Sequence, residues 1–352
     1  IVIVDAYAAP GIADDLATFD AVFGLPDPQL TVVAPQGANW DPTDPEQQGW
    51  AGETDLDVQW AHAVAPGAKI VLVQARSSDD ADILAATKWA VDHNVGDVIS
   101  QSFGEDERCV APAIARAQHQ VFQKATAKGI TLFASSGDQG SAQPDCDGDS
   151  YRKAVSSPAT DPLVTAVGGT FLDTTVPGGA YLEEATWNES DIYEAAGGGG
   201  YSRLVGKPWF QKAVVRGSKR AVPDVAYNAG TNSGVICVFG DAATAGQGQA
   251  YFLVGGTSAG SPQGAGLAAI GAQIAHHRLG AINDDLYALG SSRKAKSLFH
   301  DITGGNNAFT YNAGDDNFVT VPGYAAKRGW DAATGWGSPI ASSLVPALAR
   351  RA

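Results

Sequence analysis

The sequence predicts an α/β protein in which helices flank a mostly parallel central sheet. Over the first 170 residues, short apolar runs alternate with segments whose apolar residues recur at helical spacing, which is typical of a parallel sheet with crossover helices. Hydrophobic residues make up 44% of the 352 residues and charged residues only 17%, so the chain can bury a large core and is not mainly disordered. The longest uncharged stretch, 242–275, contains Gln, Ser, Pro and many Gly residues and is therefore no membrane span.

The elements can be assigned in chain order. Six apolar runs are expected to form the strands of the sheet: 1–4, 30–34, 69–74, 98–102, 131–135 and 164–167. Five segments with helical spacing are expected to pack on it: 12–22, 55–64, 80–94, 111–128 and 261–277. Residues 171–254 contain glycine-rich segments and short β-rich runs at 235–238 and 250–254, which favour antiparallel strands and long loops. No linker interrupts the chain, so we expect one domain over 1–352 with a loop-rich tail at 299–339, although the length alone would allow two.

Charge and cysteine usage limit the partners and the compartment. The 23 basic and 38 acidic residues give a net charge of −15, which would repel nucleic acid and anionic membrane surfaces. The chain starts in an apolar run at Ile1 rather than at Met, so we expect that a signal peptide or a pro-segment has been removed upstream and that the protein is secreted. Cys109 and Cys146 lie in polar, loop-like segments and could form a disulfide, with Cys237 left in an apolar strand; three reduced thiols are the alternative.

The segment 255–262, Gly-Gly-Thr-Ser-Ala-Gly-Ser-Pro, contains the best candidate for a nucleophile. Its Ser258 follows the expected strand at 250–254 and precedes a helix that should open at Pro262. A serine among such small neighbours is exposed on a tight turn, and the start of the helix favours negative charge that develops there. The alternative is an ordinary glycine-rich turn with a serine that caps the helix.

Histidine is the usual base for a reactive serine, but none of the six histidines lies in a segment that suits this role. His-Gly-Thr does not occur, and the first strand ends in Asp5-Ala6 without a following glycine. The histidines concerned are His62, His93, His119, His276, His277 and His300. A histidine-dependent hydrolase is therefore disfavoured.

Carboxylates are the other candidates for acid–base chemistry. Glu53 and Asp57 are four residues apart, so on a helix they point the same way, and their repulsion raises the proton affinity of the pair. Asp138 follows an apolar strand in Ser-Ser-Gly-Asp, at the carboxyl end of the strand where α/β sheets place their sites. The alternatives are a solvated acidic helix start for the first two residues and an Asx turn for Asp138.

Taken together and in this order, the motifs resemble those of the sedolisin family, the serine-carboxyl peptidases. The resemblance covers almost the whole chain and is carried by segments 4–7, 53–57, 60–63, 65–68, 98–104, 135–138, 166–170, the glycine run before Ser202, 208–211, 223–226 and 255–258. It implies a subtilisin-like three-layer fold and an acidic triad in place of the usual histidine triad.

The resemblance also implies a role for each acid. Ser258 would be the nucleophile, Glu53 the general base, and Asp57 the acid that orients Glu53. Asp138 would stand where subtilisin-like enzymes use a neutral amide, so it must be protonated to donate a hydrogen bond to the oxyanion. Asp5 would be a further acid beside the base. Because Asp138 has to keep its proton, the expected activity lies well below neutral pH.

Substrate contacts are implied by the same resemblance. Two segments are expected to line the cleft as backbone partners of an extended peptide: Ser102, Phe103 and Gly104, and Ser135, Ser136 and Gly137. The family commonly has Trp where this chain has Phe103, so the pocket wall is expected to differ here.

The tail resembles the family's calcium site. The resemblance implies one structural Ca²⁺ held by the side chains of Asp301 and Asp331 and by the backbone carbonyls of Ile302, Lys327 and Gly329, an oxygen set of the kind that calcium takes. Lys327 stands where the family usually has Gly. Without the resemblance, both aspartates would be interpreted as turn residues.

The sequence therefore predicts a secreted, pro-peptide-activated serine-type endopeptidase that works in acid. Its expected partners are protein or peptide substrates and its own amino-terminal pro-peptide, with no nucleic acid and no membrane, and we expect a monomer. One alternative is a catalytically inactive, calcium-stabilised binding protein on the same fold. Another is tripeptidyl-peptidase specificity.

Overall fold

The computed structural model describes all 352 residues and is built around one mixed sheet of eight strands. Seven of them follow the order β11-β10-β6-β4-β1-β3-β2, and β14 pairs with β10. All neighbours run parallel except β10 and β11. The strands are β1 (Val2–Ala6), β2 (Gln29–Val33), β3 (Lys69–Ala75), β4 (Val98–Gln101), β6 (Thr131–Ser135), β10 (Thr165–Thr174), β11 (Tyr181–Thr186) and β14 (Val225–Asn228). The predicted α/β class and the six predicted strands are confirmed.

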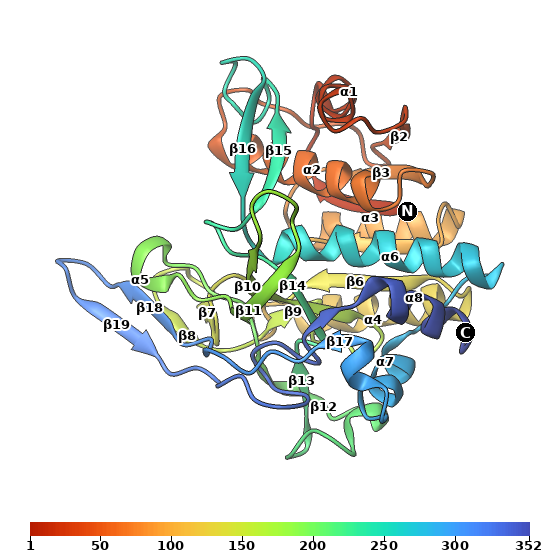
Figure 1. Cartoon of the computed structure of the whole chain (residues 1–352). Coiled ribbons are helices and arrows are strands. Elements are labelled where there is room, and N and C mark those ends of the chain that lie inside the picture. The colour runs from red at the N-terminus through yellow and green to blue at the C-terminus, as the bar shows by residue number, and fades with distance from the viewer.

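Helices cover both faces of this sheet, which gives three layers (Figure 1). One face packs on α1 (Ile12–Phe23), α2 (Pro45–Val64) and α6 (Gly260–Ala275), and the other on α3 (Asp80–His93) and α4 (Pro112–Ala127). Side chains of a strand alternate between faces, so Ile3 lies with α2 and α6, and Val2 and Val4 with α3 and α4. By the same alternation Asp5, two residues after Ile3, is directed at α2.

The predicted helices are present, but α2 begins ten residues before the expected 55. Asp44 caps it by accepting a hydrogen bond from the Glu46 amide at 2.9 Å, and Pro45 occupies the first helical position, where its missing N–H costs nothing. The first turns read Pro-Glu-Gln-Gln-Gly and carry no apolar stripe, which is why the pattern did not reveal them. Glu53 and Asp57 consequently lie in the middle of a helix and not at a solvated helix start.

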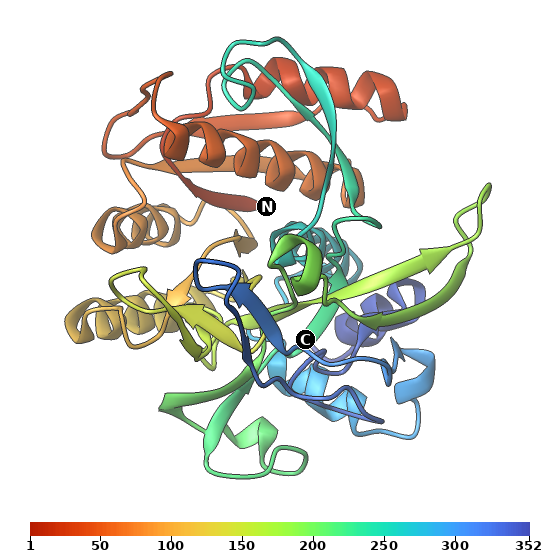
Figure 2. The ribbon, with the colours of Figure 1, turned by 90° about the vertical axis from the view of Figure 1, so that its left-hand side faces the viewer.

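The segment 171–254 is only partly as expected. It forms antiparallel pairs as predicted, but β14 joins the central sheet in parallel. In Figure 2, β10 and β11 run out together from the body of the molecule. Two-stranded antiparallel sheets are formed by β12 (Gly200–Gly206) with β13 (Lys219–Val222), β15 (Val235–Phe239) with β16 (Ala250–Val254), β17 (Phe299–His300) with β20 (Ser338–Pro339), β18 (Phe309–Asn312) with β19 (Phe318–Val321), β5 (Glu105–Asp106) with β9 (Ser156–Ser157), and β7 (Ala142–Pro144) with β8 (Tyr151–Lys153).

The remaining helices and the cysteines complete the fold. The helices are α5 (Ser190–Tyr193), α7 (Asn283–Gly290) and α8 (Ala341–Ala349), with short 3₁₀ turns η1 (Trp209–Gln211), η2 (Thr257–Ala259) and η3 (Ala295–Ser297). Cys109 and Cys146 form a disulfide, and Cys237 is free and buried. No helix has both the length and the apolar character that crossing a membrane requires.

Candidate active site

The predicted acids and the predicted nucleophile meet at the carboxyl ends of the central strands. Asp5 is the second-to-last residue of β1, Ser102 directly follows β4, and Asp138 lies three residues after the end of β6. Helix α2 brings Glu53 and Asp57 to the same edge, and η2 brings Ser258. This is the edge of an open parallel sheet at which α/β proteins place their sites.

Ser258 lies in the turn η2, which connects the hairpin strand β16 to α6. Its Oγ donates a long hydrogen bond of 3.4 Å to the carbonyl of Ser102, and the side chain is half-buried. The turn depends on Gly256, whose φ of +112° disfavours any other residue and whose missing Cβ would lie 2.8 Å from Oδ2 of Asp138. The turn therefore lies against Asp138, with the predicted nucleophile two residues further along.

Glu53 and Asp57 are stacked one helical turn apart on α2. Asp57 is fully buried, and its Oδ1 accepts a hydrogen bond of 2.8 Å from Oγ of Ser102. Ser102 therefore links Asp57 to Ser258 by two contacts, because its hydroxyl also lies 3.3 Å from the Ser258 carbonyl. Sequence reasoning predicted Ser102 as a backbone partner of the substrate and missed this role of its side chain.

Burial raises the pKa values of this group of acids. It raises the pKa of Asp5 to about 7, although the neighbouring Thr54 hydroxyl acts to lower it. Burial, followed by the negative charge of Asp5, raises the pKa of Glu53 to about 8, while a hydrogen bond with Ser258 lowers it. The pKa of Asp57 is held well above its ordinary value by burial and by the charges of Asp5 and Glu53. At acid pH protons are therefore retained within this group of carboxyls.

Unpartnered oxygens in the same group support shared protons. Both carboxyl oxygens of Asp5, Oε1 of Glu53 and Oδ2 of Asp57 are buried without a hydrogen-bond donor. A buried acceptor without a donor is costly, and a carboxyl that is protonated supplies one. We refer to Asp5, Glu53 and Asp57 as the acid cluster, and infer that protons held within it satisfy these oxygens.

Asp138 is arranged so that one oxygen is fixed and the other is free. Its Oδ1 accepts hydrogen bonds from the backbone amide of Thr257 at 2.8 Å and from the Thr257 hydroxyl at 2.7 Å. No donor reaches Oδ2, which lies against Gly256. Burial raises the pKa of Asp138, and Oδ2 is the oxygen left open to carry a proton. Thr257 was not predicted as a site residue; its position in Gly-Thr-Ser is the only signal for it in the sequence.

Comparisons with known proteins agree with this geometry. The profile of the subtilase family (Peptidase_S8) matches residues 49–283. Kumamolisin from Bacillus sp. (strain MN-32) is 36% identical over 342 residues, which cover 95% of this chain and 57% of kumamolisin. A solved structure of Pseudomonas sedolisin, complexed with two molecules of pseudo-iodotyrostatin, superposes with a TM-score of 0.82 at 32% identity and covers 98% of this chain and 90% of that one. The chain belongs to the sedolisin branch of the subtilase family.

The chain therefore contains a serine-type peptidase domain of the sedolisin kind, on a subtilisin-like fold. It spans about half the length of the curated relatives it matches. Tripeptidyl-peptidase 1 of Canis lupus familiaris, for example, is 30% identical over 76% of this chain but only 45% of its own length is covered.

The histidines of this sedolisin-like chain are engaged elsewhere. His62 is fully buried and contacts the Pro26 carbonyl at 3.0 Å, and His119 pairs with Asp161 at 2.7 Å. His93 and His277 bond backbone carbonyls, and His300 stacks on Tyr181. His276 ends α6 far from the turn that carries Ser258, at the other end of that helix. No histidine contacts Ser258, in agreement with the sequence interpretation.

The two predicted substrate segments flank Ser258 and Asp138. Gly137 donates its amide to the Thr257 hydroxyl at 3.2 Å, and the Ser136 hydroxyl donates to the Gly198 carbonyl at 2.7 Å. Phe103 is half-buried and packs on Trp50, with 6.2 Å between ring centroids. Both segments thus hold fixed positions at the site, and their contact with substrate stays a prediction.

The predicted calcium ligands lie together in the tail. Asp301 Oδ1 accepts the amide of Gly329 at 2.9 Å, and Asp331 Oδ2 accepts the amide of Lys327 at 2.8 Å, so both carboxylates hold the same loop. The backbone carbonyls of Ile302, Lys327 and Gly329 accept no hydrogen bond within the chain. The protein has no group of three or more His, Cys, Asp or Glu side chains able to hold a metal, so a cation here would depend on these carbonyls. Two carboxylates with three free carbonyls fit calcium, which prefers oxygen ligands.

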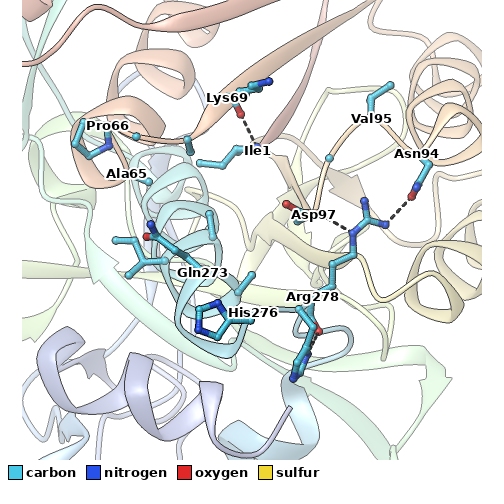
Figure 3. Close-up of a pocket in the computed structure, with 17 residues that line it drawn as sticks. Ile1, Ala65, Pro66, Lys69, Asn94, Val95, Asp97, Gln273, His276 and Arg278 are labelled. Carbon is cyan, nitrogen blue, oxygen red and sulfur yellow. Dashed lines mark hydrogen bonds and ion pairs between the residues drawn. The ribbon is translucent and has the colours of Figure 1, made fainter.

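A cavity of about 820 Å³ lies at the amino-terminal ends of the central strands and contains none of the predicted site residues. It is bounded by the start of β1, the segment before β4 and the end of α6. Figure 3 shows Arg278 in it, bonded to Asp97 and Asn94, each at 2.6 Å. The predicted site residues lie at the carboxyl ends of the strands, and none of them lines this cavity.

A second buried acid ties α2 to the hairpin that leads to Ser258. Gln59 of α2 bonds both the amide and the carbonyl of Val238 in β15, at 2.9 and 2.7 Å. Asp55, one turn earlier, is buried against Gly240, and burial, followed by the charge of Asp15, raises the pKa of Asp55 to about 9. Because folding raises this pKa, the contribution of Asp55 to the free energy of unfolding depends on pH.

Replacing Asp55 by Asn is expected to make the melting temperature depend less on pH. A carboxyl whose pKa is raised on folding contributes fully below its unfolded pKa, near about 4, and its contribution falls as pH rises towards the folded value of about 9. Wild type should therefore melt at a lower temperature at about pH 8 than at about pH 4. Asp55→Asn should narrow this difference in melting temperature, because one such carboxyl changes the free energy of unfolding by up to about 1.4 kcal/mol per pH unit. Thermal melts at both pH values test this, with the exposed Asp149→Asn as control. An equal shift of the Asp55→Asn melting temperature at both pH values would contradict it.

Proposed function

We propose that this chain is an acid-active serine-carboxyl endopeptidase that cleaves peptide bonds through an acyl-enzyme on Ser258. The proposal is supported by two buried carboxyls beside the turn that carries Ser258: Glu53, whose pKa is raised by burial and lowered in part by a hydrogen bond with Ser258, and Asp138, whose Oδ2 lies against Gly256, two residues before Ser258. Hydrolysis of casein at about pH 4 and about pH 8 is the direct test of the activity, and acid hydrolysis that is lost in Ser258→Ala is the expected result.

The first half-reaction forms the acyl-enzyme. Oγ of Ser258 turns from the Ser102 carbonyl to the substrate and attacks the scissile carbonyl carbon, while Glu53 takes its proton. The carbonyl oxygen becomes negative and accepts a hydrogen bond from the proton on Oδ2 of Asp138. When the intermediate collapses, protonated Glu53 gives its proton to the leaving amine. The second half-reaction repeats these steps with water as the nucleophile and releases Ser258.

The acid cluster explains how a carboxyl with a raised pKa can act as a base. If Asp5 and Asp57 keep their protons, one negative charge can reside on Glu53 without a charged neighbour. Asp57 then holds its position through the Ser102 hydroxyl, at 2.8 Å. As pH rises, Asp138 loses the proton with which it stabilises the oxyanion, and the cluster accumulates charge. Both changes oppose catalysis, so activity is expected below neutral pH.

The expected compartment and maturation are proposals of the same kind. A disulfide between Cys109 and Cys146 suits a secreted protein, because disulfides persist in oxidising compartments. We propose that the peptidase is secreted, acts as a monomer and is released from a pro-peptide.

We also propose that Asp301, Asp331 and the carbonyls of Ile302, Lys327 and Gly329 hold one Ca²⁺ that stabilises the tail. The ion would offset the buried negative charge of Asp331, whose pKa is raised by burial, and would fix the loop to the core.

Removal of calcium is expected to lower the melting temperature by roughly 5 °C or more, since an ion at about 100 times its Kd adds about 2.7 kcal/mol. Melts with excess chelator and with excess calcium measure the difference. Asp331→Asn should abolish the response to calcium, and Asp149→Asn should keep it. A wild-type protein whose melting temperature ignores both chelator and calcium would rule the site out.

A further inference from the structure

A second cavity, of about 800 Å³, opens beside the proposed substrate segment at Phe103 and Gly104. It lies between the first turns of α2, the loop before α3 and the start of α4. Four of its lining residues are acids, Glu46, Asp79, Asp80 and Glu105, and two are aromatic, Trp50 and Phe103. We call it the acidic cavity.

The acids of this cavity have no cationic partner. No Lys, Arg or His lines it, and none of the four carboxylates takes part in an ion pair. Glu105 is half-buried, and its pKa is raised to about 7 by burial, the charge of Asp80 and a hydrogen bond with that residue. Uncompensated negative charge in a partly buried cavity favours a bound cation.

The shape and lining favour an organic cation over a metal ion. The four acids do not form a group able to hold a metal. Trp50 and Phe103 instead offer an aromatic wall, and Ile83 and Ile114 add aliphatic surface. A lysine or arginine side chain matches both parts, because its apolar stem packs on the rings and its charged end reaches the carboxylates.

The distance from the nucleophile indicates which substrate residue reaches the cavity. Ser258 Oγ contacts the carbonyl of Ser102 at 3.4 Å, and the cavity begins one to three residues further along that segment, at Phe103, Gly104 and Glu105. An extended chain advances about 3.3 Å per residue, so a peptide lying along this segment places a side chain two to four residues from the scissile bond at the cavity.

We propose that the acidic cavity binds a lysine or arginine side chain of the substrate, two to four residues on the amino-terminal side of the scissile bond, and so makes this peptidase prefer basic residues there. The inference rests on the proposed function, since it names the specificity of the same site. A free amino terminus is the other substrate cation that could occupy the cavity, and the experiment separates the two.

The test compares kcat/KM for amino-terminally acetylated, internally quenched peptides that carry either arginine or its neutral isostere citrulline at one position at a time. At about pH 5, above the ordinary pKa range of Asp and Glu, arginine should exceed citrulline by roughly tenfold at one position two to four residues before the scissile bond. The Arg/citrulline ratio should fall towards one in Asp80→Asn. It should change less in Glu105→Gln, because Glu105, with a pKa of about 7, is already neutral at this pH. Glu46→Gln, at an exposed acid, should lower the ratio without disturbing buried structure. Glu183→Gln on β11, away from the cavity, is the matched control and should keep the ratio.

Other outcomes overturn the inference in distinguishable ways. Cleavage of all peptides with equal rates for arginine and citrulline rejects the basic preference and leaves the proposed peptidase activity intact. Cleavage only of peptides with a free amino terminus assigns the cation to the terminal amine and rejects the side-chain proposal. A preference that appears only after the scissile bond rejects its placement. Absence of any cleavage rejects the proposed function, and the inference with it.

Discussion

Replacing Ser258 by alanine is expected to lower kcat by roughly a millionfold, and replacing Glu53 by glutamine to lower it by at least about a thousandfold. The first change removes the attacking oxygen. The second keeps the size of the side chain but removes the carboxylate that is proposed to accept the proton of Ser258. Rates on one peptide at about pH 4, with melting temperatures to confirm folding, measure both effects.

Two control variants test whether a histidine, and not Glu53, acts as the base. His119→Ala and His300→Ala change histidines that lie on exposed or stacked sites away from Ser258, and both should keep near wild-type rates. A Glu53→Gln variant with more than about a tenth of wild-type activity would contradict the carboxyl mechanism, because the amide cannot act as a base at any accessible pH.

Asp138→Ala is expected to lower kcat by roughly a hundredfold to a thousandfold, the loss seen when one oxyanion donor is removed. Asp138→Asn should lose less, because its amide group donates a hydrogen bond from the position of Oδ2. It should also lose less activity as pH rises, since an amide donor does not ionise. The measurement is the ratio of kcat at about pH 7 to kcat at about pH 4 for wild type and both variants.

Two results would contradict this role. If Asp138→Asn falls with pH as steeply as wild type, ionisation of Asp138 does not control the pH dependence. If Asp138→Ala keeps wild-type rates, Asp138 does not touch the oxyanion. Thr257→Val offers an independent check, because it removes one of the two hydrogen bonds that hold Oδ1, the one at 2.7 Å, and keeps the other, from the backbone amide. It should reduce kcat while leaving Asp138 in place.

Much of this site could be predicted because its parts are local. The strands at 69–74 and 131–135 are continuous apolar runs, as buried parallel strands must be, and the four-residue spacing of Glu53 and Asp57 fixes their common face on any helix. The assignment of roles depended on the joint order of the motifs, since each one alone has an ordinary structural interpretation.

The parts that escaped prediction depend on contacts between distant segments. The early start of α2 is set by the cap at Asp44 and not by an apolar stripe. Strand β14 has only four residues, and its place beside β10 is decided by pairing. The contacts of Ser102 with Asp57 and of Thr257 with Asp138 span 45 and 119 residues of sequence. The spacing of apolar residues along the sequence gives no information about such long-range contacts.

The acidic composition fits the same account. With 38 acidic and 23 basic residues, the chain gains little excess positive charge in acid, and buried carboxyls with raised pKa values such as Asp5, Asp55 and Glu105 are neutral there. We therefore expect acid to stabilise this fold, because it protonates groups that the folded state keeps protonated more readily than the unfolded chain.

The central claim is that Ser258 works with carboxyls that must hold protons, and the pH dependence of kcat/KM tests it most directly. Measured for wild type from about pH 3 to about pH 9, the profile should peak well below neutral and fall as rising pH removes the proton of Asp138, whose pKa is raised by burial. Full activity at neutral and alkaline pH, of the kind that a histidine base supports, would contradict it.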